Sequence, residues 1–309
     1  MAVFFEIDHL PAFRKAAITI GTFDGVHNGH KAILKEVVNH ASAAGGESIL
    51  LTFEPHPRKV LFPDQPIGII TPLKQKIQLI LDTGIRHIVV VPFTSFFANM
   101  TAEEYISNFI VQRFHPHSII IGYDHHFGHD RAGDINLLRQ FAKQFNYEIA
   151  EIPAQLIAEA AVSSTKIRNA ILSGNISEAN AMLGRIYSFV GRVVHGNKIG
   201  RTIGYPTANL QLNHPDQVLP GNGIYSVKVI YNSSVYIGMM SIGYNPTVTT
   251  TRDIKIEVNI FDFDHDIYDC DIEVCVVAKL RDEKKFESLD ALKLQLHSDK
   301  VDTICKFNF

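Results

Sequence analysis

Apolar and polar residues follow different periods in the two halves of the chain. The first half contains five short runs of mostly apolar residues, separated by stretches with helical spacing. These runs are predicted strands, at residues 16–23, 48–54, 87–93, 118–124 and 147–154. Strands that are apolar on both faces and alternate with amphipathic helices are typical of a parallel sheet covered on both sides. The first half is therefore predicted to be an α/β domain.

Three of the intervening stretches have clear helix signals. Apolar residues recur at helical spacing over 33–41 and over 137–145. Thr101 and Glu104 have the spacing of a capping box, which predicts the start of a helix over 101–114.

After about residue 186 the apolar residues alternate with polar ones at period two. Segments with this alternation cover 188–196, 223–243, 254–263 and 267–280, and Gly, Asn and Pro separate them. The pattern predicts an antiparallel barrel or sandwich, on which a final helix over 288–307 is expected to pack. The change of period predicts a domain boundary between residues 185 and 186.

Three polar segments directly follow predicted strands of the first half, at residues 21–30, 53–57 and 122–130. In a parallel α/β sheet, ligands bind beyond the carboxyl ends of the strands. We therefore expect these segments to converge on one ligand site.

The composition is that of a globular protein with more than one core, since 46% of the 309 residues are hydrophobic and 20% are charged. A net charge of -3 gives no sign of general binding to nucleic acids or membrane surfaces. No segment reaches the roughly 18–20 apolar residues of a membrane span, and Glu6 and Asp8 lie where a secretory signal has a basic flank. The three cysteines lack metal-binding or C-x-x-C spacing and are expected to be reduced and buried. We expect a cytoplasmic protein.

The first polar segment, 21–30, reads GTFDGVHNGH and lies at a strand-to-helix turn. A helix N-terminus carries unpaired N–H groups and a partial positive charge, which suit a phosphate. Gly25 and Gly29 allow a phosphate chain to approach the backbone, and His27 and His30 face one side of the first helical turn. The alternative is that the four-residue H-x-G-H motif occurs here by coincidence.

A second predicted helix start, at 162–171, combines hydroxyl groups with cations. The residues are Ser163, Ser164, Thr165, Lys166 and Arg168. This combination also suits phosphate, although an ordinary N-cap with exposed charges explains the same residues.

The second half has a glycine-rich basic segment, 191–210, that ends in PTAN. Such loops cradle phosphates through backbone amides, or form barrel turns that need positive φ. Thr207 and Asn209 project to one side of an extended segment, where their oxygens suit Mg²⁺; outward polar residues on a strand are the alternative. Glu257 lies within an apolar strand, either as an exposed carboxylate or as a base at a barrel mouth.

The segments 21–30, 51–57, 122–134 and 162–168 resemble the nucleotidyltransferase superfamily, which shares an H-x-G-H signature with class I aminoacyl-tRNA synthetases. More closely, they resemble the adenylyltransferase module of bacterial bifunctional riboflavin kinase/FAD synthetases. The resemblance implies a Rossmann-like domain, at 1–185, in which the FMN phosphate attacks the α-phosphorus of ATP and pyrophosphate leaves. This chemistry needs no protein nucleophile, only positioning and charge stabilisation, normally with Mg²⁺.

The resemblance also assigns residues to this reaction. ATP is expected to lie over 21–30, with His27, His30 and Arg168 as the catalytic groups. The further implied contacts to ATP and its phosphates are Gly21, Thr22, Phe23, Asp24, Gly29, Ser164 and Thr165. The implied FMN contacts are Asp124, Phe127 and His56. His125 departs from the family motif, which has Phe there, and for His56 and His126 surface or packing roles are equally open.

Four motifs over residues 190–286, GRTIGYPTANL, GIYSV, IEVNIFDF and LRDEKKF, resemble the riboflavin kinase module of the same family. They imply a six-stranded Greek-key β-barrel with a terminal helix, at 186–309, that phosphorylates riboflavin to FMN with ATP. Thr207 and Asn209 are then expected to bind Mg²⁺, and Glu257 to activate the ribityl 5′-hydroxyl as the catalytic base. The other implied contacts are Gly196, Lys198, Gly200, Gly204 and Pro206 for ATP, and Arg281, Glu283 and Phe286 for the flavin.

The sequence thus predicts a two-domain enzyme that converts riboflavin to FMN and FMN to FAD. Its expected ligands are riboflavin, FMN, FAD, ATP and Mg²⁺, with no nucleic acid, membrane or obligate protein partner. Two alternatives are an enzyme in which one module has lost its activity and a non-catalytic flavin-binding protein. Both are disfavoured because His27, His30 and Glu257 occur together.

Overall fold

The computed structural model describes residues 1–122, 125–152, 162–196, 200, 203–244 and 254–307. Asp124, Lys198 and Arg201 therefore lie outside the described residues. The chain forms two compact units, Met1–Ser164 and Thr165–Phe309. This division falls earlier in the chain than the boundary predicted at 185/186, because helix α10 (Ile176–Leu183) packs on strands of the second unit. The boundary between the functional domains stays a prediction.

The first unit is built on a parallel six-stranded sheet with the order β1-β4-β3-β2-β5-β6. The strands are β1 (Ala2–Phe4), β2 (Ala16–Ile20), β3 (Glu47–Glu54), β4 (His87–Pro92), β5 (Ser118–Gly122) and β6 (Glu148–Ile152). Five of them confirm the predicted strands. The sequence missed β1, because three residues are too few to show a period.

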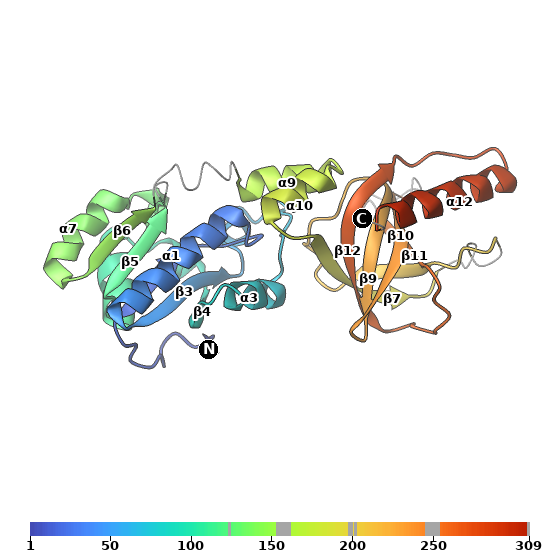
Figure 1. Ribbon diagram of the computed structural model, residues 1–309. Coiled ribbons are helices and arrows are strands. Elements are labelled where there is room, and N and C mark those ends of the chain that lie inside the picture. Colours follow the sequence, from blue (N-terminus) through green and yellow to red (C-terminus); the bar gives the residue numbers. More distant parts are fainter. Residues whose placement is uncertain (123–124, 153–161, 197–199, 201–202, 245–253, 308–309) are drawn as a thin grey trace. The chain divides into compact units, whose positions relative to one another are not determined.

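Helices cover both faces of this sheet, as Figure 1 shows for α1 and α7. They are α1 (Asn28–Ala44), α2 (Pro57–Leu61), α3 (Leu73–Leu81), α4 (Ser95–Ala98), α5 (Ala102–Glu104), η1 (Tyr105–Val111), α6 (Gln112–Phe114), η2 (His129–Arg131) and α7 (Ile135–Phe145), with α9 (Ser164–Leu172) starting at the end of the unit. Successive strand residues point into two separate cores: Ala17 packs with α1 and α3, whereas Ile18 packs with η1 and α7. This two-sided burial explains why the central strands are mostly apolar on both faces.

The stretch 101–114 is helical as predicted, and its capping box is confirmed. The Thr101 hydroxyl accepts the Glu104 N–H, and the Glu104 carboxylate accepts the Thr101 N–H. The middle of this stretch, η1, is a π-helix rather than an α-helix.

The second unit is a closed six-stranded antiparallel barrel with the order β10-β11-β8-β7-β12-β9. Its strands are β7 (Tyr187–Val194), β8 (Ala208–Leu212), β9 (Gly223–Tyr231), β10 (Ser234–Tyr244), β11 (Ile254–Ile260) and β12 (Asp271–Arg281). The closed ring confirms a barrel and excludes the sandwich. The predicted terminal helix is α12 (Leu289–Cys305), which packs on β10 and β12 beside the barrel in Figure 1.

The cysteines agree only in part with their predicted burial. All three, Cys270, Cys275 and Cys305, are free thiols. Cys270 and Cys275 are partly buried, but Cys305 is exposed at the end of α12, so the prediction of burial is wrong for that residue. Within the described part of the chain, no helix has the length and hydropathy needed to cross a membrane.

Candidate active sites

The carboxyl ends of β3, β2 and β5 are adjacent, because these strands are neighbours in the parallel sheet. The segments 21–30, 53–57 and 122–130 lie at the carboxyl ends of β2, β3 and β5, respectively. The predicted convergence at one sheet edge is therefore confirmed for their described residues.

The H-x-G-H motif forms the start of α1. His27 is the N-cap, and its Nδ1 accepts the backbone N–H of His30 at 3.3 Å. The two imidazole rings stack with centroids 3.6 Å apart and planes at 16°. Gly25, in the turn before them, has a φ of 90°, which other residues adopt only with strain. Both imidazoles therefore lie at a helix N-terminus, as predicted.

His30 is held in its neutral form. Its Nδ1 atom is buried and has no hydrogen-bond partner among the described residues. Burial, followed by the nearby His27 and Lys76, holds the pKa of the His30 imidazole well below 6.5. At neutral pH this imidazole carries one N–H and no charge.

The turn before α1 is tied to the start of α9. The buried Asp24 carboxylate accepts backbone N–H groups of Ile70 and Thr71, each at 3.0 Å. The Asp24 carbonyl accepts the Ser164 hydroxyl at 2.9 Å. Two motifs predicted to contact phosphate, 21–30 and 162–168, thus meet through Asp24 and Ser164.

Thr165, Lys166 and Arg168 of that second motif belong to the second unit. Thr165 is exposed and Arg168 is partly buried on α9. Their predicted roles at the phosphates of ATP stay predictions.

Sequence reasoning missed Lys76, a lysine buried beneath the same turn. Its ammonium group donates to the Thr52 hydroxyl at 3.0 Å and to the Thr22 carbonyl at 3.2 Å. Burial lowers the pKa of Lys76. The sequence did contain one signal for it. Lys76 lies four residues before Ile80 on the buried face of α3, so it is a charged residue at a position where the helical period calls for an apolar one.

Two of the predicted FMN contacts, Phe127 and His56, lie within the described residues, and both have structural contacts there. Phe127 is in the core, where its ring stacks on Tyr105 at 5.1 Å. His125, the departure from the family motif, lies with its ring 5.9 Å from that of Phe127. His56 caps α2 by accepting the Arg58 N–H at 3.2 Å. The capping supports a structural role for His56; its predicted contact with FMN stays a prediction.

The barrel unit contains a pocket of about 310 Å³ that gathers residues predicted for four different roles: ATP contact, cation ligand, catalytic base and flavin contact. These residues are Gly200, Thr207, Glu257, Arg281, Glu283 and Phe286. Apolar side chains of Ile224, Met239 and Leu296 line the same pocket. An apolar pocket with a few convergent polar groups is typical of a small-molecule site.

Glu257 lies on β11, directly opposite Asn209 of β8 and Ser241 of β10. Its carboxylate accepts the Lys255 ammonium at 2.8 Å, and 29% of its side chain is exposed. It is therefore neither an outward carboxylate nor fully enclosed: it lies in the pocket wall, within reach of a ligand. Asn259, on the same strand face, was missed by sequence reasoning; its amide donates to the Pro206 carbonyl at 2.6 Å and so holds the PTAN segment.

The glycines of the basic segment meet two different needs. Gly204 has a φ of 85°, which fits the interpretation as a barrel turn. At Gly196, an added Cβ would overlap the Asn209 amide. The absence of a side chain at Gly196 therefore leaves room for the side chain of Asn209, one of the two predicted cation ligands.

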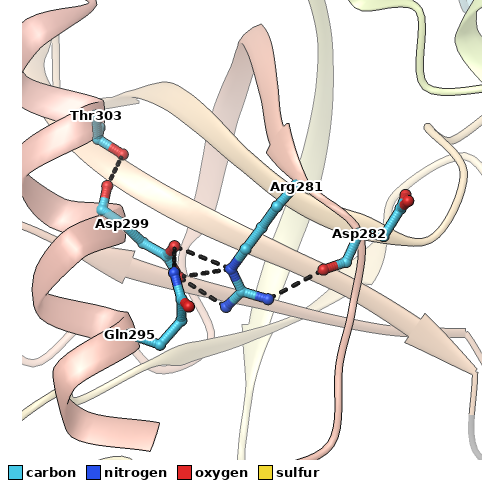
Figure 2. A network of polar contacts seen from close by, with 5 residues as sticks. All are labelled: Arg281, Asp282, Gln295, Asp299 and Thr303. Carbon is cyan, nitrogen blue, oxygen red and sulfur yellow. Dashed lines mark hydrogen bonds and ion pairs between the residues drawn. The ribbon is translucent and has the colours of Figure 1, made fainter. Parts of the chain in front are cut away.

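Arg281 is anchored to the terminal helix (Figure 2). Its Nε and Nη2 donate to the Asp299 carboxylate at 2.9 and 2.7 Å, and its Nη1 donates to the Asp282 carbonyl. Gln295 also donates to Asp299, at 2.9 Å. The Phe286 ring lies 5.8 Å from the guanidinium. This network connects α12 to the wall of the pocket.

Asp299→Ala is expected to lower the free energy of unfolding of the barrel unit by about 3–5 kcal/mol, because a guanidinium that is only 18% exposed loses its partner. Replacing both partners, Arg281→Met with Asp299→Leu, should restore most of that stability. Denaturant unfolding of the three proteins measures the difference. The double variant should also need more riboflavin for half-maximal FMN formation, since Arg281 lines the pocket. Equal destabilisation in the single and double variants would contradict the ion pair's role.

A second pocket of the barrel unit, about 450 Å³, shares Thr207 with the first. Sequence reasoning missed most of its wall, which includes Phe263, His265 and Tyr268. Pro206, a predicted ATP contact, also lines it. Thr207 thus lies between two cavities of substrate size.

Both candidate sites suit phosphate chemistry, one at the start of a helix and one beside a carboxylate in a barrel. An enzyme with two such sites belongs to the class of transferases that move phosphoryl and nucleotidyl groups.

Comparisons with known proteins identify the family. A family model described as FAD synthetase matches residues 10–166, and one described as riboflavin kinase matches residues 183–305. The bifunctional riboflavin kinase/FMN adenylyltransferase of Listeria monocytogenes is 37% identical, over 93% of this chain and 90% of that protein. The protein of the same name from Escherichia coli K12 is 34% identical, over 92% of this chain and 90% of its own length.

A crystal structure described as a macrolide-efflux protein from Streptococcus pneumoniae is also similar. It has 31% identity and a TM-score of 0.87, and the match covers 99% of this chain and 98% of that one. The chain belongs to the family of bifunctional riboflavin kinase/FMN adenylyltransferases. It phosphorylates riboflavin to FMN and adenylylates FMN to FAD, which confirms the predicted pair of activities over the one-activity and non-catalytic alternatives.

Proposed function

We propose that the two barrel pockets hold the two substrates of the kinase reaction and meet at Thr207. The flavin occupies the pocket with Glu257, where apolar walls suit the ring and polar groups suit the ribityl chain. ATP occupies the other pocket, whose aromatic and apolar side chains suit a purine base. The observation that carries this assignment is that Thr207 lines both pockets.

Glu257 acts as the general base of the kinase. As the ribityl 5′-oxygen bonds to the γ-phosphorus of ATP, its proton must leave, and the carboxylate accepts it. The bond from the γ-phosphorus to the bridging oxygen breaks, and ADP leaves. Before substrate binds, the Lys255 ammonium forms an ion pair with Glu257 and so offsets the negative charge of this partly buried carboxylate.

The oxygens of Thr207 and Asn209 fit a hard cation, and Gly196 leaves the room that the Asn209 amide occupies. These two residues would hold Mg²⁺, which supplies charge neutralisation at the β- and γ-phosphates. Asn259 fixes the backbone of the PTAN segment through Pro206 and would in this way position the two residues for the ion.

Removing Mg²⁺ with a chelator is expected to stop both reactions. The substitution Asn209→Ala should raise the Mg²⁺ concentration needed for half-maximal FMN formation by about tenfold or more, since loss of even an outer-shell partner of a metal ligand costs about 10–100-fold in affinity. The Mg²⁺ requirement of FAD formation from supplied FMN should stay unchanged in the same variant, which serves as its control. An unaltered Mg²⁺ requirement for FMN formation would remove Asn209 from the cation site.

In the adenylyltransferase reaction, the FMN phosphate oxygen attacks the α-phosphorus of ATP and pyrophosphate leaves. The start of α1 binds the phosphates through its backbone N–H groups and its dipole. Neutral His30 donates its N–H to the charge that develops on the leaving pyrophosphate. Ser164, whose hydroxyl donates to the Asp24 carbonyl, binds the same phosphates from the start of α9.

The ligands of the chain are small molecules, and we propose that it works in the cytoplasm without an obligate protein partner. The cysteine usage of the sequence supports the location, since a reducing compartment keeps such cysteines as thiols.

A further inference from the structure

Lys76 is a buried lysine beneath the turn that precedes α1. Only 6% of its surface is exposed, and it reaches the turn from α3, a helix that supplies none of the predicted site residues. Its two hydrogen-bond acceptors, the Thr22 carbonyl and the Thr52 hydroxyl, are neutral. Among the described residues, no carboxylate forms an ion pair with it.

A buried ammonium with only neutral partners is unfavourable to the folded chain by itself. The two carboxylates whose charge acts on it are Glu54 and Asp24. Asp24, however, uses its oxygens to accept the N–H groups of Ile70 and Thr71. The positive charge of Lys76 is therefore only partly compensated within the fold, directly under the turn.

We propose that Lys76 is a positioning residue of the adenylyltransferase site, which fixes the Thr22 carbonyl from beneath and places a positive charge under the phosphates of ATP. The proposal rests on the proposed binding of ATP over 21–30. Two anchors then hold this turn: Lys76 through Thr22 on one side, and Asp24 through Ile70 and Thr71 on the other.

The hydroxyl of Thr52 completes the support. It accepts from Lys76 at 3.0 Å and donates to the same Thr22 carbonyl at 3.1 Å. Lys76, Thr52 and Thr22 thus form a closed triangle that joins α3, β3 and the turn. Lys76 also acts on His30, because its charge helps to keep that imidazole neutral and able to donate a single N–H.

The test is Lys76→Met, which keeps the length of the side chain and removes its charge. The turnover number for FAD formation from FMN should fall between about 10- and 100-fold, as a small displacement of the reacting groups causes. The KM for FMN should change much less. The melting temperature should be equal or higher, because a buried charge is removed, and FMN formation from riboflavin should be unchanged.

Lys74→Met is the matched control, since Lys74 lies on the same helix and is exposed. It should leave both activities as in the wild type. Thr52→Val removes the hydroxyl without changing the shape, and should reduce FAD formation in the wild type but add little in Lys76→Met, because both substitutions break one triangle.

Three outcomes would overturn the proposal. One is full FAD formation by Lys76→Met; the second is a loss matched by an equal fall in melting temperature and kinase activity; the third is additive effects of Thr52→Val and Lys76→Met. Should Lys76→Met fail to fold, normal turnover in Thr52→Val would also overturn it. If the wild type itself made no FAD from FMN, the proposed function would fail instead, so the two failures are distinguishable.

Discussion

Replacing Glu257 by glutamine is expected to lower the turnover number for FMN formation by about 10²–10⁴-fold, the usual loss on removal of a general base. Glutamine keeps the shape and much of the hydrogen bonding at the wall of the flavin pocket but cannot accept the ribityl proton. Riboflavin affinity should change far less, because the apolar pocket walls and Phe286 are untouched. The measurements are the turnover number for FMN formation and riboflavin affinity on the same variant.

Two controls accompany Glu257→Gln. Glu287→Gln, at an exposed position of the loop before α12, should leave FMN formation as in the wild type. FAD formation from supplied FMN should survive in Glu257→Gln, because Glu257 lies in the barrel pocket and not at the start of α1. Near-normal kinase turnover in Glu257→Gln would remove the glutamate from the mechanism and leave the proton to solvent or ATP.

Replacing His30 by alanine is expected to reduce FAD formation from FMN by about 10²–10³-fold, the usual effect of losing one donor to a developing negative charge. The imidazole is neutral at rest, so the loss is that of a positioned N–H rather than of a fixed charge. The turnover number for FAD formation and the rate of FMN formation are the quantities to compare.

His40→Ala is the matched control, because His40 lies further along the same helix, α1. It should retain FAD formation, and His30→Ala should retain FMN formation from riboflavin. An equal loss of both activities in His30→Ala would point to misfolding and contradict the assigned role.

Most of the fold could be predicted because the two units bury their strands differently. Strands β2 to β5 are covered on both faces and are mostly apolar on both, whereas the barrel strands alternate. Strand β1 and the π-helical turn η1 could not be predicted. The first is too short to show a period, and the second differs from an α-helix only in hydrogen bonding that its sequence does not encode.

The site residues also divide into those that the sequence reveals and those that only the fold reveals. His27, His30, Thr207 and Glu257 lie in short motifs, so the sequence alone singled them out. Lys76 and Asp299 act through partners 54 and 18 residues away, and only the fold brings these pairs together. In the wall formed by Phe263, His265 and Tyr268, Phe263 ends the motif IEVNIFDF and the other two residues lie beyond it, so only the shape of the pocket reveals that the three line one cavity.

The central claim is that one chain carries two separate sites whose reactions follow one another through FMN. It is tested most directly by giving riboflavin, ATP and Mg²⁺ to His30→Ala and Glu257→Gln, separately and as an equimolar mixture, and separating the flavins by chromatography. His30→Ala alone should accumulate FMN, Glu257→Gln alone should leave riboflavin unchanged, and the mixture should form FAD. Wild-type FAD formation by either variant alone, or no FAD from the mixture, would contradict the claim.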